Sequence, residues 1–119
     1  MIWRKLIRLA AISTITSIAR KSLGSVRNNH ELNMILKGIV DELCMIAETQ
    51  NFILKSEVVL SQIEELPESL TTSMQRDIQA GKKSEIEAIL GNTIRLGKSK
   101  GLIIPQLEKC YMNLTKYEK

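Results

Sequence analysis

Two short stretches of this sequence contain residue types that could support proton transfer. Lys5 belongs to the stretch Trp3–Lys5, which opens a strongly apolar segment, and burial of an ammonium group is costly unless it finds a partner. The second stretch comprises Ser73–Asp77 together with Ser84–Glu87. A buried lysine with a lowered pKa can act as a general acid toward a developing alkoxide, and a nearby carboxylate can orient it.

The same residues also have purely structural interpretations. A lysine such as Lys5 is commonly a solvated residue in the first turn of a helix. A carboxylate such as Glu85 stabilises a helix N-terminus through its interaction with the helix dipole. Composition and spacing alone therefore leave the catalytic and the structural interpretations open.

The sequence does not contain the residue patterns that metal binding, thiol redox chemistry or nucleotide binding would need. His30 is the only histidine, and Cys44 and Cys110 match no metal or redox spacing, so no metal site is expected. Both cysteines lie in apolar helical stripes, which predicts reduced, buried thiols and suits a reducing compartment. No Gly-x-Gly-x-x-Gly turn follows a strand pattern, so this chain alone is expected to bind no NADPH or other cofactor.

The elements that must position these residues are helices, because apolar residues recur at helical spacing in six segments. These run roughly over residues 2–20, 31–50, 56–66, 68–80, 84 to 97 or 101, and from 105 onward. Gly24 and Asn28–Asn29 mark a break after the first, and Pro67 stops the third. Ser84 with Glu87 forms a capping box. The prediction is an all-α fold, a compact bundle of about six helices.

The net charge of +4 is concentrated near the start of the chain, where the first thirty residues contain six basic and no acidic residues. Such a basic segment could bind nucleic acid, a membrane surface or an anionic small molecule. Four aromatic residues, without interleaved basic ones, do not suit base stacking, so no nucleic acid partner is expected. The apolar stretch 9–19 is shorter than the about 20 residues that span a bilayer, so no membrane partner is expected.

Residues 1–19 also have the outline of a secretory signal, with a basic start, a short apolar stretch and small residues near Ala19. Four hydroxyl-bearing residues between Ser13 and Ser17 dilute the apolar stretch. Judged on these residues alone, a signal peptide and a core helix are nearly even alternatives.

Several motifs occur in one order along the chain: Trp3-Arg4-Lys5-Leu6, Ser73-Met74, Asp77-Ile78, Ser84-Glu85-Ile86, Gly91 and Gly101-x-x-x-Pro105. In order and spacing they resemble the C-terminal domain of the ketopantoate reductases, the 2-dehydropantoate 2-reductases of the pantothenate pathway. The resemblance covers essentially the whole chain, and residues 73–91 are its most specific part. It implies that residues 1–119 form a single helical domain, similar to the C-terminal domain of 6-phosphogluconate dehydrogenase.

The resemblance also implies a function, the NADPH-dependent reduction of 2-dehydropantoate to pantoate by a cytoplasmic oxidoreductase. An N-terminal Rossmann domain would hold NADPH; it is absent from residues 1–119 and would act in cis or in trans. Lys5 would donate the proton, Glu85 would hold the lysine and the substrate in register, and Ser73 would hydrogen-bond the small 2-oxo acid substrate. The chain alone is expected to be inactive.

Three positions depart from the family pattern. Asparagines usually follow the lysine at four and eight residues, where this chain has Leu9 and Ser13, and a third aligns near Leu23. Leucine forms no side-chain hydrogen bond, and a site for a polar substrate loses affinity when polar groups lack partners. The substrate is therefore expected to differ, or the activity to be lost.

Two further interpretations remain beside the enzyme half. One is a non-catalytic helical dimerisation or interaction module derived from the same family. The other is a secreted or membrane-associated helical protein in which residues 1–19 are a signal. A homo-oligomer is expected, because the helix over residues 2–20 is apolar on nearly every side and large exposed apolar patches tend to find partners.

Overall fold

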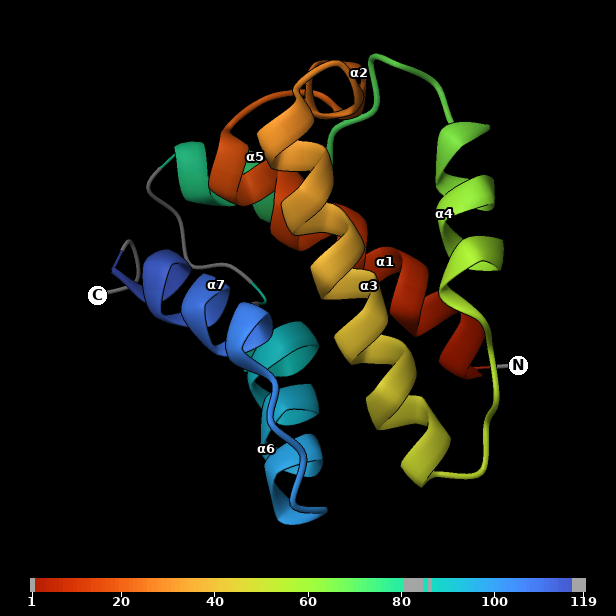
Figure 1. Ribbon diagram of the computed structural model, residues 1–119. Helices are drawn as coiled ribbons and strands as arrows, with labels where there is room; N and C mark the ends of the chain where they lie inside the picture. The colour runs from red at the N-terminus through yellow and green to blue at the C-terminus, as the bar shows by residue number, and fades with distance from the viewer. Residues whose placement is uncertain (1, 81–84, 86, 117–119) are drawn as a thin grey trace.

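A computed structural model describes residues 2–80, 85 and 87–116 of the chain, and the elements in this part are helices (Figure 1). In chain order they are α1 (Ile2–Ala19), α2 (Leu23–Arg27), α3 (His30–Thr49), α4 (Ser56–Glu64), α5 (Ser73–Gln79), the π-helix η1 (Glu87–Gly91), α6 (Asn92–Ser99) and α7 (Pro105–Thr115). No strand occurs among the described residues. The predicted all-α fold is confirmed.

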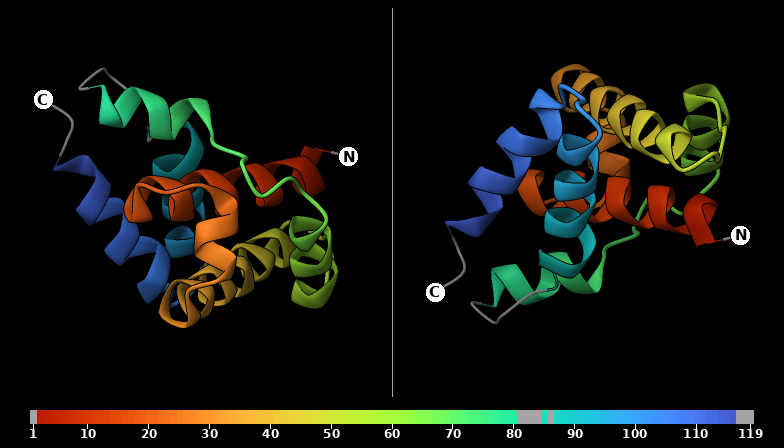
Figure 2. Two further views of the ribbon diagram at one scale, coloured as in Figure 1. Left: turned by 90° about the horizontal axis from the view of Figure 1, so that it is seen from above. Right: turned by 90° about the horizontal axis from the view of Figure 1, so that it is seen from below.

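Helix α1 lies at the centre of the bundle. Residues 10–17 are all buried, and α1 packs against α2, α3, α4, α5, α7 and η1 (Figure 2). The sequence has no charged residue between Leu9 and Ala19, so the helix can be enclosed on every side without burying a charge. Within the described part of the chain, no helix combines the length and the apolar character needed to cross a membrane.

Most of the predicted helix boundaries agree with the structure within two residues, but two differ. The predicted break between the first two helices is confirmed at Asn28–Asn29, which lie between α2 and α3, but Gly24 lies inside α2 and does not mark it. The expected helix start near Glu68 was also wrong, because α5 begins at Ser73. The Thr72 hydroxyl accepts a hydrogen bond from the Gln75 backbone N–H at 3.2 Å, which caps α5 at this point.

The helix predicted from residue 84 onward is divided in the structure. Ser84 of the capping box lies outside the described residues. The following residues form η1, and α6 continues directly from it. The Thr93 hydroxyl donates to the Ile89 carbonyl at 2.9 Å, across the junction of the two helices.

Helix α7 is capped by a carboxylate from another helix. Pro105 at its start has no N–H, and the side chain of the preceding Ile104 cannot accept a hydrogen bond. The buried Glu42 of α3 supplies the cap: its two carboxylate oxygens accept from the backbone N–H groups of Gln106 at 2.9 Å and Leu107 at 2.7 Å. This cap fixes α7 against the middle of α3.

We expect Glu42→Gln to lower the free energy of unfolding by about 1–3 kcal/mol. The amide keeps the shape of the side chain but offers one acceptor oxygen and no charge to the N-terminus of α7. Urea unfolding measures the loss. The control is Glu48→Gln on the same helix, where the side chain is exposed. An equal effect of the two substitutions would contradict the capping role.

Both cysteines are buried and neither forms a disulfide, as predicted. Burial raises the pKa of the Cys110 thiol to about 12, and the nearby Glu42 carboxylate adds to this rise while Lys109 opposes it. Burial likewise raises the pKa of Cys44. The thiols therefore stay protonated at neutral pH, and a protonated buried thiol is a poor nucleophile.

The raised pKa of Cys110 predicts a loss of stability in alkali. The thiol ionises near pH 9 in the unfolded chain but only near pH 12 in the folded one, so its contribution is complete below pH 9 and disappears as the pH rises toward 12. Between pH 8 and 10.5 this loss should reach up to about 2 kcal/mol in urea unfolding. In Cys110→Ala the same pH change should cost less; equal pH dependence would contradict the assignment.

Candidate substrate groove

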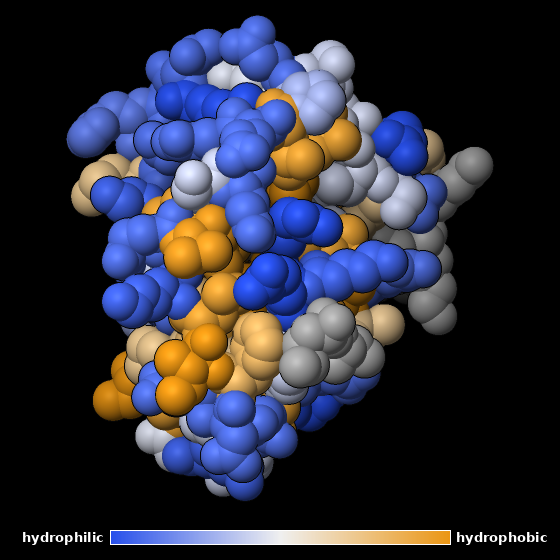
Figure 3. Space-filling view, turned by 90° about the vertical axis from the view of Figure 1, so that its right-hand side faces the viewer, coloured by the Kyte–Doolittle hydropathy of each residue, from blue (hydrophilic) through white to orange (hydrophobic). Residues whose placement is uncertain are grey.

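A groove of about 400 Å³ lies between the N-terminal half of α1 and the segment that leads into α5. Its volume is within the range of about 300–1,000 Å³ that is typical of small-molecule sites. The residues that line it are Lys5, Arg8, Leu9, Ile12, Leu66, Leu70, Thr71, Thr72 and Ser73. Figure 3 views the molecule from the side of α4 and the N-terminus of α1, where apolar surface adjoins strongly hydrophilic side chains.

Helix α1 contributes one wall through residues that are spaced three and four apart. Lys5, Arg8, Leu9 and Ile12 therefore share one face of the helix. Lys5 is exposed and Arg8 is half-buried, while Leu9 has 42% of its surface exposed. Ile12, with 5% exposed, forms part of the core beneath. This wall therefore combines two cationic side chains, Lys5 and Arg8, with aliphatic ones.

The opposite wall is held in place by α2. The backbone N–H groups of Leu23 and Gly24 donate to the carbonyl groups of Leu70 at 3.0 Å and Glu68 at 2.8 Å. A Cβ atom on Gly24 would stand only 2.7 Å from the Cβ of Glu68, so glycine is needed for this close approach. The wall thus depends on two backbone hydrogen bonds and one glycine.

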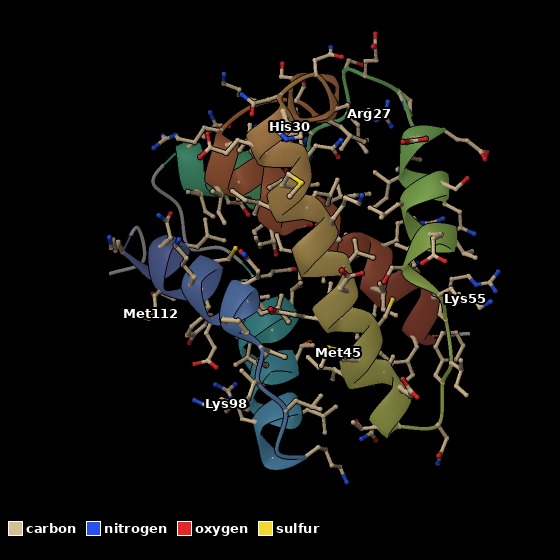
Figure 4. The ribbon with its side chains drawn as sticks, in the orientation of Figure 1. Arg27, His30, Met45, Lys55, Lys98 and Met112 are labelled. Carbon is tan, nitrogen blue, oxygen red and sulfur yellow. The ribbon has the colours of Figure 1, made fainter. Side chains whose placement is uncertain are left out.

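The Arg27 side chain of α2 holds the start of this wall, near Leu66 (Figure 4). Its Nη2 atom donates to the carbonyl groups of Ile63 and Leu66, at the C-terminal end of α4. Carbonyl groups at a helix C-terminus lack partners within the helix and carry partial negative charge, so a guanidinium is a favourable donor there. Leu66 is thereby fixed where the groove begins.

Three hydroxyl groups line this wall, and two of them have structural partners. The Thr72 hydroxyl caps α5, and the Thr71 hydroxyl accepts from Nη1 of Arg76 at 2.9 Å. Ser73 is exposed, and its hydroxyl has no hydrogen-bond partner among the described residues. The Thr71 and Thr72 hydroxyls each retain an O–H that can donate, and Ser73 is the hydroxyl of this wall that no described residue engages.

Two of the three predicted site residues line the same groove. Lys5 and Ser73, 68 positions apart in the sequence, both belong to it. Glu85 is an exposed residue just before η1, its carbonyl accepts the Ile89 N–H at 2.9 Å, and it is not among the lining residues. The catalytic and binding roles of all three residues stay predictions.

The positions where asparagines were expected have different surroundings. Leu9 lines the groove. Ser13 has 1% of its surface exposed and is not a lining residue, although the family asparagine at this position is expected to bind the substrate. Leu23 is fully buried in the core. Of the three departures, only Leu9 therefore changes the surface that a ligand in this groove would meet.

Sequence reasoning missed Arg8 as a site residue. It lies three positions after Lys5, so the helical spacing that relates positions 9 and 13 to Lys5 also places it on this face. No Asp or Glu is among the lining residues, and neither Lys5 nor Arg8 has an ion pair within the described part of the chain. Two cations without a carboxylate favour an anionic ligand.

The described residues form a helical domain that has a cationic groove and contains no strand. Residues 1–118 match the family model described as "Ketopantoate reductase PanE/ApbA C terminal". The chain therefore belongs to the ketopantoate reductase family, as its C-terminal domain, which confirms the resemblance seen in the sequence.

Similarity to individual known proteins supports this family assignment. A 2-dehydropantoate 2-reductase of Archaeoglobus fulgidus is 28% identical over 101 residues, which cover 85% of this chain and 34% of that protein. The dimeric ketopantoate reductase from Staphylococcus aureus is 25% identical, with a TM-score of 0.90 over 98% of this chain and 42% of that one. A D-mandelate dehydrogenase solved with NADH and anilino(oxo)acetate shares the fold at 21% identity, with a TM-score of 0.88 over 98% of this chain and 40% of that one.

The chain spans about 34% of the length of the Archaeoglobus relative and 42% of the Staphylococcus structure. The Archaeoglobus and Staphylococcus proteins are named as reductases, and the D-mandelate dehydrogenase was solved with NADH. The comparisons thus assign the domain to a family of reductases.

We expect Gly24→Ala to disturb the groove wall and to destabilise the fold by about 1–3 kcal/mol, because the added methyl group would meet the Cβ and carbonyl of Glu68. Amide hydrogen exchange should show reduced protection of the Leu23 N–H, which donates to Leu70. Ser25→Ala, at an exposed neighbouring position of α2, is the control. Unchanged protection in Gly24→Ala would show that the wall does not depend on this contact.

Proposed function

We propose that this chain is the substrate-contacting half of an NADPH-dependent 2-oxo acid reductase, related to the enzymes that reduce 2-dehydropantoate to pantoate. The single observation that supports this most strongly is the convergence of Lys5 and Ser73 on one cationic groove. Membership of the ketopantoate reductase family supplies the reaction type. The groove supplies the ligand chemistry, because two cations and a serine hydroxyl suit the carboxylate and ketone of a 2-oxo acid.

In the proposed reaction, the Lys5 ammonium donates its proton to the ketone oxygen as that oxygen becomes an alkoxide. The Ser73 hydroxyl holds the substrate by a hydrogen bond. Glu85 would act as a positioning residue for Lys5 and the substrate, and it would have to approach the groove in the complex to do so. A reduced nicotinamide would supply the hydride that the ketone carbon accepts.

The cofactor would be held by another domain. The described residues contain no strand and hence no Gly-rich turn between a strand and a helix, so this part of the chain does not fit a nicotinamide dinucleotide. We accordingly propose an N-terminal Rossmann domain as the partner, in cis or in trans. Its place would be beside the N-terminus of α1, where Lys5 lies.

We also propose that the protein is a homo-oligomer, as the Staphylococcus relative is a dimer. Exposed apolar side chains on several helices are consistent with this, among them Met34 on α3 with 57% and Met112 on α7 with 67% of their surface exposed. The alternative of a non-catalytic interaction module would retain such surfaces without the reaction.

The test joins this chain to the cofactor-binding domain of the Staphylococcus reductase and follows NADPH oxidation with a panel of 2-oxo acids. We expect turnover with at least one of them. Lys5→Ala should lower kcat by about 10²–10⁴, because proton donation is lost. The exposed Lys55→Ala, with the same change in charge, should leave kcat unchanged. If the two variants behave alike, or if the parent protein turns over no 2-oxo acid, the proposed function is wrong.

A further inference from the structure

We propose that Arg8 binds the carboxylate of the substrate and that the groove selects 2-oxo acids with an apolar side chain over hydroxylated ones such as 2-dehydropantoate. This inference rests on the proposed function and names the substrate class of the same groove. Its three supports are the placement of Arg8 beside Lys5, the absence of a competing carboxylate in the lining, and the apolar character of the remaining surface.

Arg8 lies one helical turn from Lys5 on the wall that α1 forms. Side chains three positions apart on a helix have Cβ atoms about 5–6 Å apart, so two long cationic side chains can reach adjacent groups of one small molecule. The carboxylate and ketone of a 2-oxo acid are on neighbouring carbon atoms. A guanidinium pairs with a carboxylate through two parallel hydrogen bonds, whereas an ammonium is a compact proton donor. The chemistry therefore assigns the carboxylate to Arg8 and the ketone oxygen to Lys5.

Arg8 is also free to take this role. It is half-buried, and within the described part of the chain its guanidinium has no ion pair or side-chain hydrogen bond. By contrast, Arg27 and Arg76, which belong to the scaffold of the same region, donate to Leu66 and Thr71. An arginine that lines a groove without a partner, where these two neighbours are paired, is suited to an anionic ligand.

The rest of the groove is suited to an apolar side chain. Leu9, Ile12, Leu66 and Leu70 contribute its aliphatic surface. The hydroxyl groups of Thr71 and Thr72 each accept a hydrogen bond, from Arg76 and from the Gln75 N–H, so each is held in place and retains its own O–H as a donor, whereas the four aliphatic side chains offer a substrate hydroxyl no partner. A hydroxyl moved from water against Leu9 would lose its hydrogen bonds, while a methyl or phenyl group there would gain from leaving water.

The experiment has two parts, of which the first measures binding to the chain itself. NMR titrations compare 4-methyl-2-oxopentanoate, 2-dehydropantoate, inorganic phosphate and 4-methyl-2-pentanone, which lacks the carboxylate. We expect 4-methyl-2-oxopentanoate to bind at least about fivefold more tightly than each of the others, with shifts at residues 66–73. Phosphate binding of equal strength would show a general anion site and would overturn the inference.

Variants then assign the carboxylate contact. Arg8→Gln should weaken binding of 4-methyl-2-oxopentanoate by at least about tenfold, and Arg8→Lys should restore part of the loss. Arg4→Gln removes the same charge from an exposed position of the same helix outside the groove, and it should change binding by less than about twofold. Equal effects of Arg8→Gln and Arg4→Gln would mean that only the overall charge matters, and the assignment to Arg8 would be wrong.

The second part uses the two-domain protein and separates this inference from the proposed function. Arg8→Gln should raise KM for 4-methyl-2-oxopentanoate more than it lowers kcat, and Leu9→Asn should raise kcat/KM for 2-dehydropantoate relative to 4-methyl-2-oxopentanoate. Turnover that prefers 2-dehydropantoate in the parent protein would overturn the inference while the proposed function stands. Selective binding by the chain without any turnover would overturn the proposed function and leave the carboxylate contact of Arg8 in place.

Discussion

The enclosure of α1 is the constraint on which the rest of the structure depends. Residues 10–17 are buried without interruption, so partners are needed on every side, and α3, α5, α7 and η1 supply much of this cover. The first turns of α1 leave the enclosure, and there Arg4, Lys5 and Arg8 would be too costly to bury. The groove therefore lies where the central helix changes from apolar to basic. The distribution of apolar and basic residues along α1 thus determines both the packing of the fold and the position of the groove.

Two polar contacts between distant segments then fix what surrounds α1. The Glu42 carboxylate caps α7, and the backbone of α2 holds the segment 66–72 that forms the second groove wall. In both cases, backbone groups that no local side chain could satisfy find partners far away in the sequence. Because each contact satisfies several buried groups at once, the loss of either one should displace an entire element.

The parts of the fold that local pattern determines could be predicted from the sequence. The boundaries of α1, α3 and α7 follow from apolar spacing and from Pro105, and the family resemblance assigns Lys5 and Ser73 to one site by their positions in the chain. Helix α2 could not be predicted, because its five residues have too short a pattern and their stability comes from contacts with residues 63–70. Arg8 was missed because the family pattern marks the asparagine positions on the Lys5 face and not every residue there.

Under the proposed function, the positions of Arg8 and Leu9 relative to Lys5 would let one domain keep a reaction type and change its substrate. Successive residues turn by about 100° around a helix, so Arg8 and Leu9 flank Lys5 on opposite sides. A family asparagine at position 9 would place a neutral donor and acceptor on one side. This chain has Leu9 there and the guanidinium of Arg8 on the other side, an arrangement that in the proposed complex would favour a carboxylate and disfavour a hydroxyl. Lys5, the proposed proton donor between them, would need no change, because both kinds of substrate present the same ketone.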